Sequence, residues 1–161
     1  ALDLYKSYLG PEAEKLPGSA LLFPLNIRPE KGSDNTIIRT IVGVSDADKS
    51  MTFAGDVPEG YVAELMHGDF ERLAEGAKKA AELAKSHRTD SNSLSILVSC
   101  IGRKLLMGQS ISDETEAVAD ALGSKVPTIG FYSYGEICHQ QFTNECVLHN
   151  QTMTVTVLHE S

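Results

Sequence analysis

The hydrophobic pattern of the chain changes its period near Asp69, and this change constrains the fold more than any other feature. Before that point, short apolar stretches rich in β-branched residues alternate with turn signals; they lie at 20–27, 36–44, 51–54 and 61–66. Strands at this spacing with short turns predict an antiparallel meander. From Asp69 to about His87, apolar residues instead recur at helical spacing, with Asp69 as the N-cap.

Strands and helices alternate in the rest of the chain. The most apolar stretch, 94–101, is predicted to be a central strand. The other expected elements are short helices at 103–107 and 112–123, the second with a capping box at Asp113 and Glu116, a strand that is led in by 126–129 and runs through 130–137, and a last strand at 147–158. A meander followed by β-α-β-α-β predicts an α/β or α+β domain with a mixed sheet and helices packed on it, as in a layered sandwich.

Composition limits the environment and the partners. The 161 residues suffice for one domain with a sizeable core. A net charge of −8 without a basic face disfavours nucleic acid and anionic membranes, and no apolar run approaches the length of a membrane span. Three cysteines are an odd number, which argues against a disulfide framework and fits a reducing, cytoplasmic location.

The stretch GFYSYGEI at 130–137 reads as a strand that runs out onto an acidic corner. Aromatic residues favour strands, and glycines leave room for a close approach to the backbone. Alternation along the strand places Tyr132, Tyr134 and Glu136 on one face and sends Phe131 into the core. The sequence therefore predicts a single Tyr-Tyr-Glu surface.

The stretch SCIGRK at 99–104 lies where a buried strand ends and a helix begins, the edge at which open α/β sheets bind ligands. Cys100 near a helix N-terminus is a candidate nucleophile, although a buried core thiol is the simpler interpretation. Arg103 follows Cys100 after only two residues, which is too short a run for the phosphate-binding loop of cysteine phosphatases. The chain has no Ser-His-Asp order, Walker loop or Rossmann fingerprint. We expect no catalytic residue and no cofactor.

Four residues near the C-terminus are of types that can bind a metal ion: Cys138, His139, Cys146 and His149. Zinc sites favour close ligand pairs, whereas these spacings are irregular. On a strand, Cys146 and His149 would also point to opposite faces. We therefore expect no metal site.

Three late stretches together resemble the C-terminal half of the FIST family: SCIGRKLLMG at 99–108, GFYSYGEI at 130–137 and LHNQTMTVTVL at 148–158. Upstream stretches, such as FPLNI at 23–27 and VPEGYVAELM at 57–66, are also similar. The resemblance implies an intracellular, non-catalytic sensory module of signal transduction that binds a small ligand, with amino acids as a proposed class.

The resemblance also implies partners. Residues 1–161 are expected to form a single FIST C-like domain and to be a fragment without the N-terminal FIST half. That half and a signalling output protein or domain are then the expected partners. Because the family also occurs with F-box proteins, a protein-interaction module is an alternative function. An enzyme that uses Cys100 is a third.

Charges at two strand ends suggest how a ligand would be held. Arg103 can grip a carboxylate and Glu136 an ammonium group, with Tyr132 or Tyr134 as an aromatic wall, which suits a zwitterion. The alternatives are that Arg103 and Glu136 pair with each other, or that Glu136 caps a helix. Asn150, on the polar face of the last strand, adds an amide or only makes a turn hydrogen bond. The predicted ligand-binding residues are Cys100, Arg103, Tyr132, Tyr134, Gly135, Glu136 and Asn150.

Overall fold

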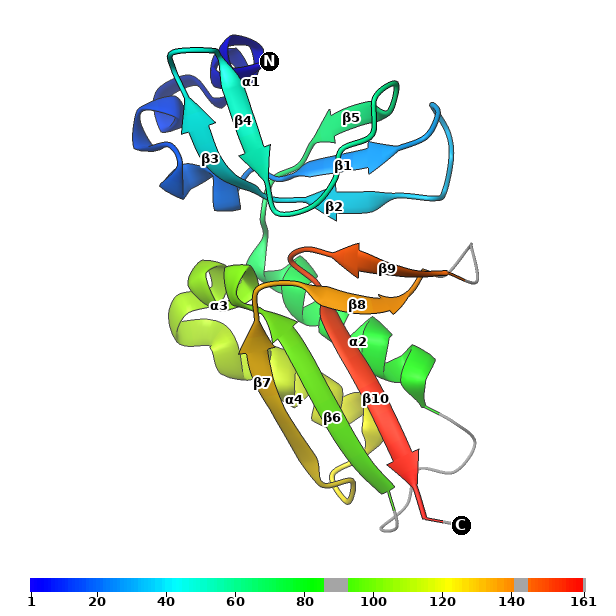
Figure 1. The fold of residues 1–161 in the computed structure, drawn as a ribbon. Helices are drawn as coiled ribbons and strands as arrows, with labels where there is room; N and C mark the ends of the chain where they lie inside the picture. Colours follow the sequence, from blue (N-terminus) through cyan, green and yellow to red (C-terminus); the bar gives the residue numbers. More distant parts are fainter. Residues whose placement is uncertain (86–92, 141–144, 161) are drawn as a thin grey trace. The chain divides into compact units, whose positions relative to one another are not determined.

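The computed structural model describes residues 1–85, 93–140 and 145–160 and has an α+β fold (Figure 1). The chain forms two compact units. Unit 1 contains Ala1–Gly68 and Ile137–Asn150, and unit 2 contains Asp69–Glu136 and Gln151–Ser161. The chain therefore passes from unit 1 to unit 2, returns, and enters unit 2 again. The prediction of one domain over 1–161 stays a prediction, and each unit is described by itself below.

Unit 1 is a small assembly of antiparallel strands with one α-helix and two 3-10 helices. Its elements in chain order are α1 (Leu2–Leu9), η1 (Gly10–Lys15), η2 (Gly18–Leu21), β1 (Leu25–Arg28), β2 (Ile37–Arg39), β3 (Ile41–Ser45), β4 (Ser50–Phe53), β5 (Val62–Leu65), β8 (Glu136–His139) and β9 (Cys146–His149). Strand β8 begins at the last residue of unit 2. The core packs Tyr5 and Leu9 of α1 against Ala20 and Ile41.

The predicted antiparallel pairing in this half is confirmed, but the strand order differs from a simple meander. Strand β1 lies between β2 and β5, while β3 and β4 form a separate hairpin. The predicted strand at 36–44 is two strands, because the chain leaves one sheet and enters another at Thr40. The predicted strand at 20–27 is wrong in its first part, where residues 18–21 form a 3-10 helix.

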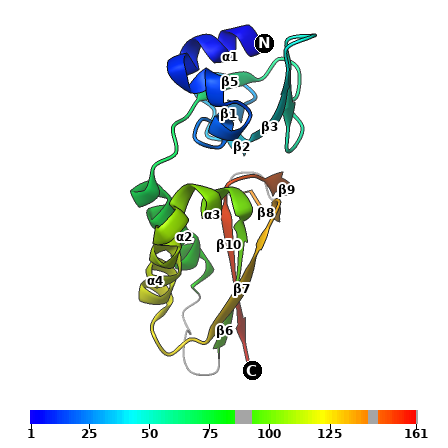
Figure 2. The same ribbon diagram turned by 90° about the vertical axis from the view of Figure 1, so that its left-hand side faces the viewer.

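Unit 2 is a three-stranded mixed sheet in the order β10-β6-β7. Its elements are α2 (Phe70–Ala84), β6 (Ser93–Cys100), α3 (Ile101–Met107), η3 (Gly108–Ser110), α4 (Ile111–Leu122), β7 (Thr128–Ser133) and β10 (Met153–His159). Strand β6 is central, as predicted; it runs parallel to β7 and antiparallel to β10. Figure 2 shows α2 and α4 together on one side of this sheet.

The core of unit 2 lies between the sheet and these helices. Ala77 and Ala81 of α2 pack with Val118 of α4, Leu97 of β6 and Met153 of β10. These alanines form the packing face of α2, and their small side chains let the helix lie close to the sheet. Val155 and Val157 of β10 alternate with threonines along the strand and pack against the same core.

Local signals at the helix ends were partly right. Asp69 caps α2 as predicted and accepts a hydrogen bond from the backbone N–H of Glu71 at 3.0 Å. The predicted capping box at Asp113 and Glu116 is wrong, because α4 begins at Ile111 and no side chain caps it. The predicted helix end near His87 lies outside the described residues.

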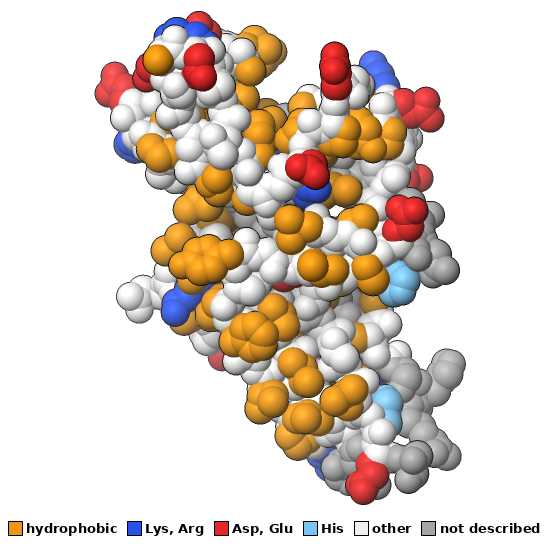
Figure 3. Space-filling model, in the orientation of Figure 1, with side chains coloured by type: hydrophobic (Ala, Val, Ile, Leu, Met, Phe, Trp, Pro, Cys, Tyr) orange, Lys and Arg blue, Asp and Glu red, His pale blue; other side chains and the backbone are white. Residues whose placement is uncertain are grey.

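The second face of the unit 2 sheet is apolar, and none of the helices described in unit 2 covers it. Register places Val98 of β6 beside Phe131 of β7, so Phe131 points to this face and is 63% exposed. The prediction that Phe131 enters the core is therefore wrong. The side chains on the face are Leu94, Ile96, Val98, Cys100, Ile129, Phe131, Ser133, Thr154, Thr156 and Leu158. Figure 3 shows the hydrophobic side chains that gather over β6, β7 and β10. We call these ten residues the open sheet face.

Candidate functional site

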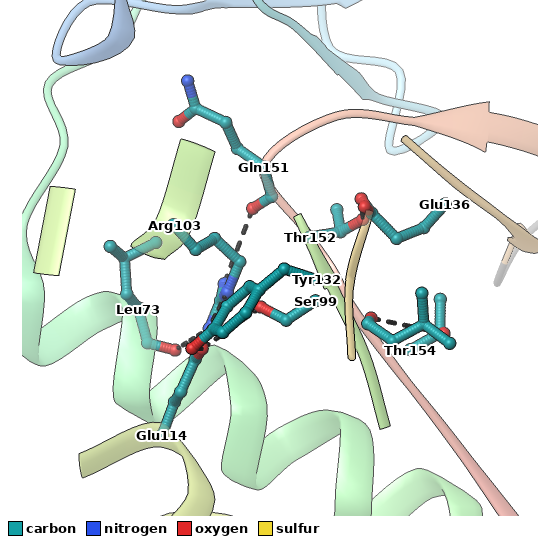
Figure 4. A network of polar contacts seen from close by, with 10 residues as sticks. Leu73, Ser99, Arg103, Glu114, Tyr132, Glu136, Gln151, Thr152 and Thr154 are labelled. Atoms are coloured by element: carbon teal, nitrogen blue, oxygen red, sulfur yellow. Dashed lines mark hydrogen bonds and ion pairs between the residues drawn. The ribbon is translucent and has the colours of Figure 1, made fainter. Parts of the chain in front are cut away.

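The polar residues of unit 2 gather where β6 and β7 end. The two strands are parallel, so their carboxyl ends share one edge of the sheet, and α3 starts directly after β6. This edge is the usual ligand-binding end of an open α/β sheet. Figure 4 shows the network of polar contacts that it carries.

A buried ion pair joins α3 to α4. Nε of Arg103 donates to Oε2 of Glu114 at 2.9 Å, and both side chains are almost fully buried. The other guanidinium nitrogens donate to the backbone carbonyls of Leu73, at 2.7 Å, and Gln151, at 3.5 Å. Arg103 therefore has a protein partner at each of its three nitrogens.

Two hydroxyl groups complete the environment of Glu114. Ser99 of β6 and Tyr132 of β7 both donate to its Oε1 at 3.1 Å. Burial raises the pKa of Tyr132, and the Glu114 carboxylate raises it further, so the phenol keeps its proton and donates it. The ammonium group of Lys104 lies 5.0 Å from the centre of the Tyr132 ring, within range of a cation–π contact.

Glu136 has its own partners and does not pair with Arg103. Its carboxylate is buried and accepts from Ser133 Oγ at 2.6 Å and from Thr152 Oγ1 at 2.8 Å. Neither predicted alternative, a pair with Arg103 or a helix cap, describes these bonds. Figure 4 shows Arg103 with Glu114 on one side of the strands and Glu136 with Thr152 on the other, so the two charged corners hold separate partners.

Cys100 lies at the end of β6 and is 5% exposed. Burial raises the pKa of its thiol, and the nearby Glu136 carboxylate adds to this effect. The N–H groups of Gly102 and Gln151 and the charge of Arg103 oppose it without reversing it. A raised pKa is the opposite of what a nucleophilic cysteine requires.

The remaining predicted site residues are dispersed. Tyr134 is 89% exposed in the turn between β7 and β8, so the predicted face of Tyr132, Tyr134 and Glu136 does not form. The strand ends at Ser133, and the turn that follows breaks the alternation. Gly135 lies in that turn.

Asn150 is not on the last strand, which begins at Met153, and its predicted position there is wrong. It is a buried residue of unit 1. Its side chain accepts from the Thr40 N–H at 3.3 Å and donates to the carbonyls of Ala54 and His149 at 3.2 and 3.1 Å. These bonds resemble the turn hydrogen bond that was predicted for Asn150 as the alternative to ligand binding.

A cavity of about 310 Å³ opens between β7 and α4, within unit 2. Leu97 and Met153 supply apolar side chains to its lining, to which Gly130, Ile129 and Phe131 of β7 also belong, although the side chains of Ile129 and Phe131 point to the open sheet face. Its polar lining comes from Ser99, Glu114, Thr115, Thr128 and Tyr132. Of the seven predicted ligand-binding residues, the lining includes Tyr132 and not Arg103 or Glu136. We call this space the β7–α4 cavity.

Glu114 is the principal residue that the sequence reasoning missed. It lies on α4 at the same helical spacing as the buried Val118 and Ala121, so it is an acid within an apolar stripe. A buried carboxylate needs polar partners, so the position of Glu114 in an apolar stripe indicated a buried polar network around it. Ser133 and Thr152 had no comparable signal, because their role depends on how β7 and β10 meet Glu136.

No group of three or more His, Cys, Asp or Glu side chains within 1–85, 93–140 and 145–160 is arranged to hold a metal ion. His149 is partly buried, and burial together with the charge of Arg39 holds its pKa below the ordinary value.

The sequence model of the FIST C domain matches residues 1–139. The chain belongs to the FIST C family. FIST C is a family of sensory domains in signalling proteins. The match includes β6, α3, α4, β7 and Glu136, and it ends before β9 and β10. No curated protein and no solved structure gave a significant match. Among the described helices of this FIST C domain, none combines the length and apolar character of a membrane span.

Proposed function

We propose that this FIST C domain is a non-catalytic, cytoplasmic sensory domain that binds a small metabolite in the β7–α4 cavity. The observation that carries the proposal is the cavity itself, a space of about 310 Å³ lined by apolar residues together with a few polar ones, Tyr132 among them. Ligand sites are typically concave, mostly apolar and provided with a few fixed polar groups. Binding at the end of β7 and α4 would then signal to an output protein or domain.

An amino acid is the ligand class that the family resemblance implies. Arg103 and Glu136 would have to leave their present partners to hold a zwitterion in the predicted way. Arg103 would lose its ion pair with Glu114, and Glu136 would lose its hydrogen bonds from Ser133 and Thr152. Amino acids are therefore tested alongside other metabolites rather than assumed.

A thermal-shift screen tests the proposal. A ligand at a hundred times its Kd stabilises by about 2.7 kcal/mol and raises Tm by roughly 5–10 °C in a domain of this size. Thr115 is an exposed lining residue, so Thr115→Phe narrows the cavity mouth and is expected to abolish the shift. Glu116→Phe adds the same ring at the next exposed position of α4, outside the lining, and is expected to leave the shift unchanged.

A lack of any shift across the metabolite panel, including with the N-terminal FIST half present, would count against sensing. A shift that survives Thr115→Phe would place the ligand outside the cavity.

The open sheet face favours a second candidate function, that of a protein-interaction module. Its ten side chains carry no charge, and β6 presents Leu94, Ile96 and Val98 on this face rather than on the face that the helices cover. The proposed occupant is the N-terminal FIST half. Phe131→Lys is expected to abolish co-purification of that half, whereas Leu105→Lys, at a similarly exposed position on α3, is expected to preserve it. Equal retention by both variants would argue against this interface.

A further inference from the structure

The hydrogen-bonding state of the β7–α4 cavity indicates which chemical class its ligand belongs to. This inference rests on the proposed function, because it concerns the same cavity. Of the polar lining residues, Ser99 and Glu114 are almost fully buried behind the surface, so a ligand meets chiefly the hydroxyls of Tyr132, Thr115 and Thr128.

Each of these three hydroxyls already donates its proton to the protein. Tyr132 donates to Glu114 at 3.1 Å, Thr115 to the carbonyl of Ser112 at 2.8 Å, and Thr128 to the carbonyl of Val126 at 3.2 Å. A hydroxyl has one proton and two lone pairs, so these groups can still accept a hydrogen bond. The side chains of the lining therefore present acceptors to a ligand.

Tyr132 is the most firmly oriented of the three. Its acceptor is a buried carboxylate, and Arg103 holds that carboxylate in place from the other side at 2.9 Å. The threonine hydroxyls are exposed to water and can turn, whereas a phenol proton bound to a buried charge cannot leave without a large loss. The chain Arg103–Glu114–Tyr132 thus fixes the Tyr132 lone pairs as the cavity's acceptor.

Charge excludes two other ligand classes. The carboxylate of a zwitterion would find no free guanidinium, since Arg103 is bonded at all three nitrogens and does not line the cavity. Glu114 offers little attraction to a cationic ligand, because Arg103 already neutralises the charge of its carboxylate and the Tyr132 hydroxyl covers it. An uncharged ligand loses less hydration on entry into such a site.

Volume sets the size. An apolar cavity of about 150 Å³ holds one benzene ring. The β7–α4 cavity, at about 310 Å³, has room for a bicyclic ring of the size of indole. We propose that the cavity binds a small, uncharged, mainly apolar ring compound that donates one hydrogen bond, from N–H or O–H, to the Tyr132 hydroxyl oxygen.

Indole and benzothiophene provide a matched test, because they have nearly the same shape and only indole has an N–H donor. Calorimetric titration of the whole chain is expected to show indole binding about three- to tenfold more tightly than benzothiophene, the effect of one net hydrogen bond. In Tyr132→Phe, which keeps the ring, the two affinities are expected to converge. Tryptophan, which adds a zwitterion to the same ring, is expected to bind at least tenfold more weakly than indole.

The outcomes separate this inference from the proposed function. Equal binding of indole and benzothiophene by the wild type, or an unchanged ratio in Tyr132→Phe, overturns the donor assignment. Tighter binding of tryptophan or another amino acid, abolished by Thr115→Phe, overturns the ligand class and leaves the sensory function standing. Binding of no probe and no metabolite overturns both. Denaturation curves of Tyr132→Phe verify that the variant is folded.

Discussion

Nε of Arg103 lies 2.9 Å from Oε2 of Glu114, and this ion pair is buried between the first turns of two consecutive helices. It does not act as a free charge at the sheet edge. It holds Glu114 where Ser99 and Tyr132 can donate to it, and so it links α3, α4, β6 and β7 at the wall of the cavity.

Removal of one partner from this pair is expected to be strongly destabilising. Glu114→Gln leaves Arg103 buried without a counter-charge, and we expect the free energy of unfolding to fall by about 3–5 kcal/mol in urea denaturation. The double variant Arg103→Met, Glu114→Leu is expected to recover most of that loss, since neither charge remains. A double variant no more stable than Glu114→Gln would show that the pair is required for more than charge compensation. Asp46→Asn, which breaks the exposed pair with Lys6, is expected to change stability little.

Cys100 is expected to behave as a buried structural thiol. Its raised pKa leaves less thiolate at neutral pH than an ordinary cysteine has, and its side chain is 5% exposed. Peptide mass spectrometry after brief alkylation at pH 7.5 should find label on the exposed Cys146 well before Cys100. Both should label at similar rates in urea. Faster labelling of native Cys100 would revive the thiol-enzyme alternative.

Unit 1 has an alkaline stability limit set by Tyr5. The buried Tyr5 hydroxyl donates to the carbonyl of Phe23 at 2.8 Å, and burial raises its pKa from 10.0 to about 12. The unfolded chain releases this proton near pH 10, whereas the folded chain keeps it. The contribution is therefore complete below pH 10 and is lost as the pH rises toward 12, by about 3 kcal/mol at about 1.4 kcal/mol per pKa unit.

Denaturation curves at intervals from pH 9 to pH 12 measure this loss. Tyr5→Phe has no ionisable phenol at this position and is expected to show a shallower decline over the same interval. Parallel curves for the two proteins would rule out Tyr5 as the cause.

Asn150 joins the segment Ile137–Asn150 to the earlier part of unit 1, because its side chain bonds to Thr40 and Ala54. Asn150→Ala leaves the N–H of the buried Thr40 and the carbonyl of the half-buried Ala54 without their present partner. Unpaired buried polar groups cost about 1–3 kcal/mol each, so we expect a loss of a few kcal/mol in the free energy of unfolding. A loss under about 0.5 kcal/mol would mean that water replaces the side chain.

The elements that local pattern determines were predictable from the sequence. The apolar run of β6 and the alanine stripe of α2 carry strong periodicity, and Asp69 carries a cap signal. Phe131 and Asn150 were misplaced for a different reason. The face that Phe131 occupies depends on the register of β7 against β6, and the position of Asn150 depends on where the chain crosses between units. Neither is encoded locally.

The candidate site, like the fold, was predictable from the sequence only where local pattern determines it. The sequence placed Arg103 and Tyr132 at the ends of neighbouring strands, and the structure has both in the polar network around Glu114, because polar residues at strand ends can be recognised from the sequence alone. It did not reveal that Arg103 and Glu136 each have other partners, since the hydroxyls of Ser133 and Thr152 reach Glu136 only through tertiary packing.

Amide-resolved NMR titration with indole tests the central claim most directly, because it reports where in the chain a small molecule binds. The account predicts saturable shifts of the amide signals of residues 97–99, 114–115 and 128–132, with little change in residues 1–68. Shifts confined to unit 1, or no saturable shift at any concentration reached, would contradict it.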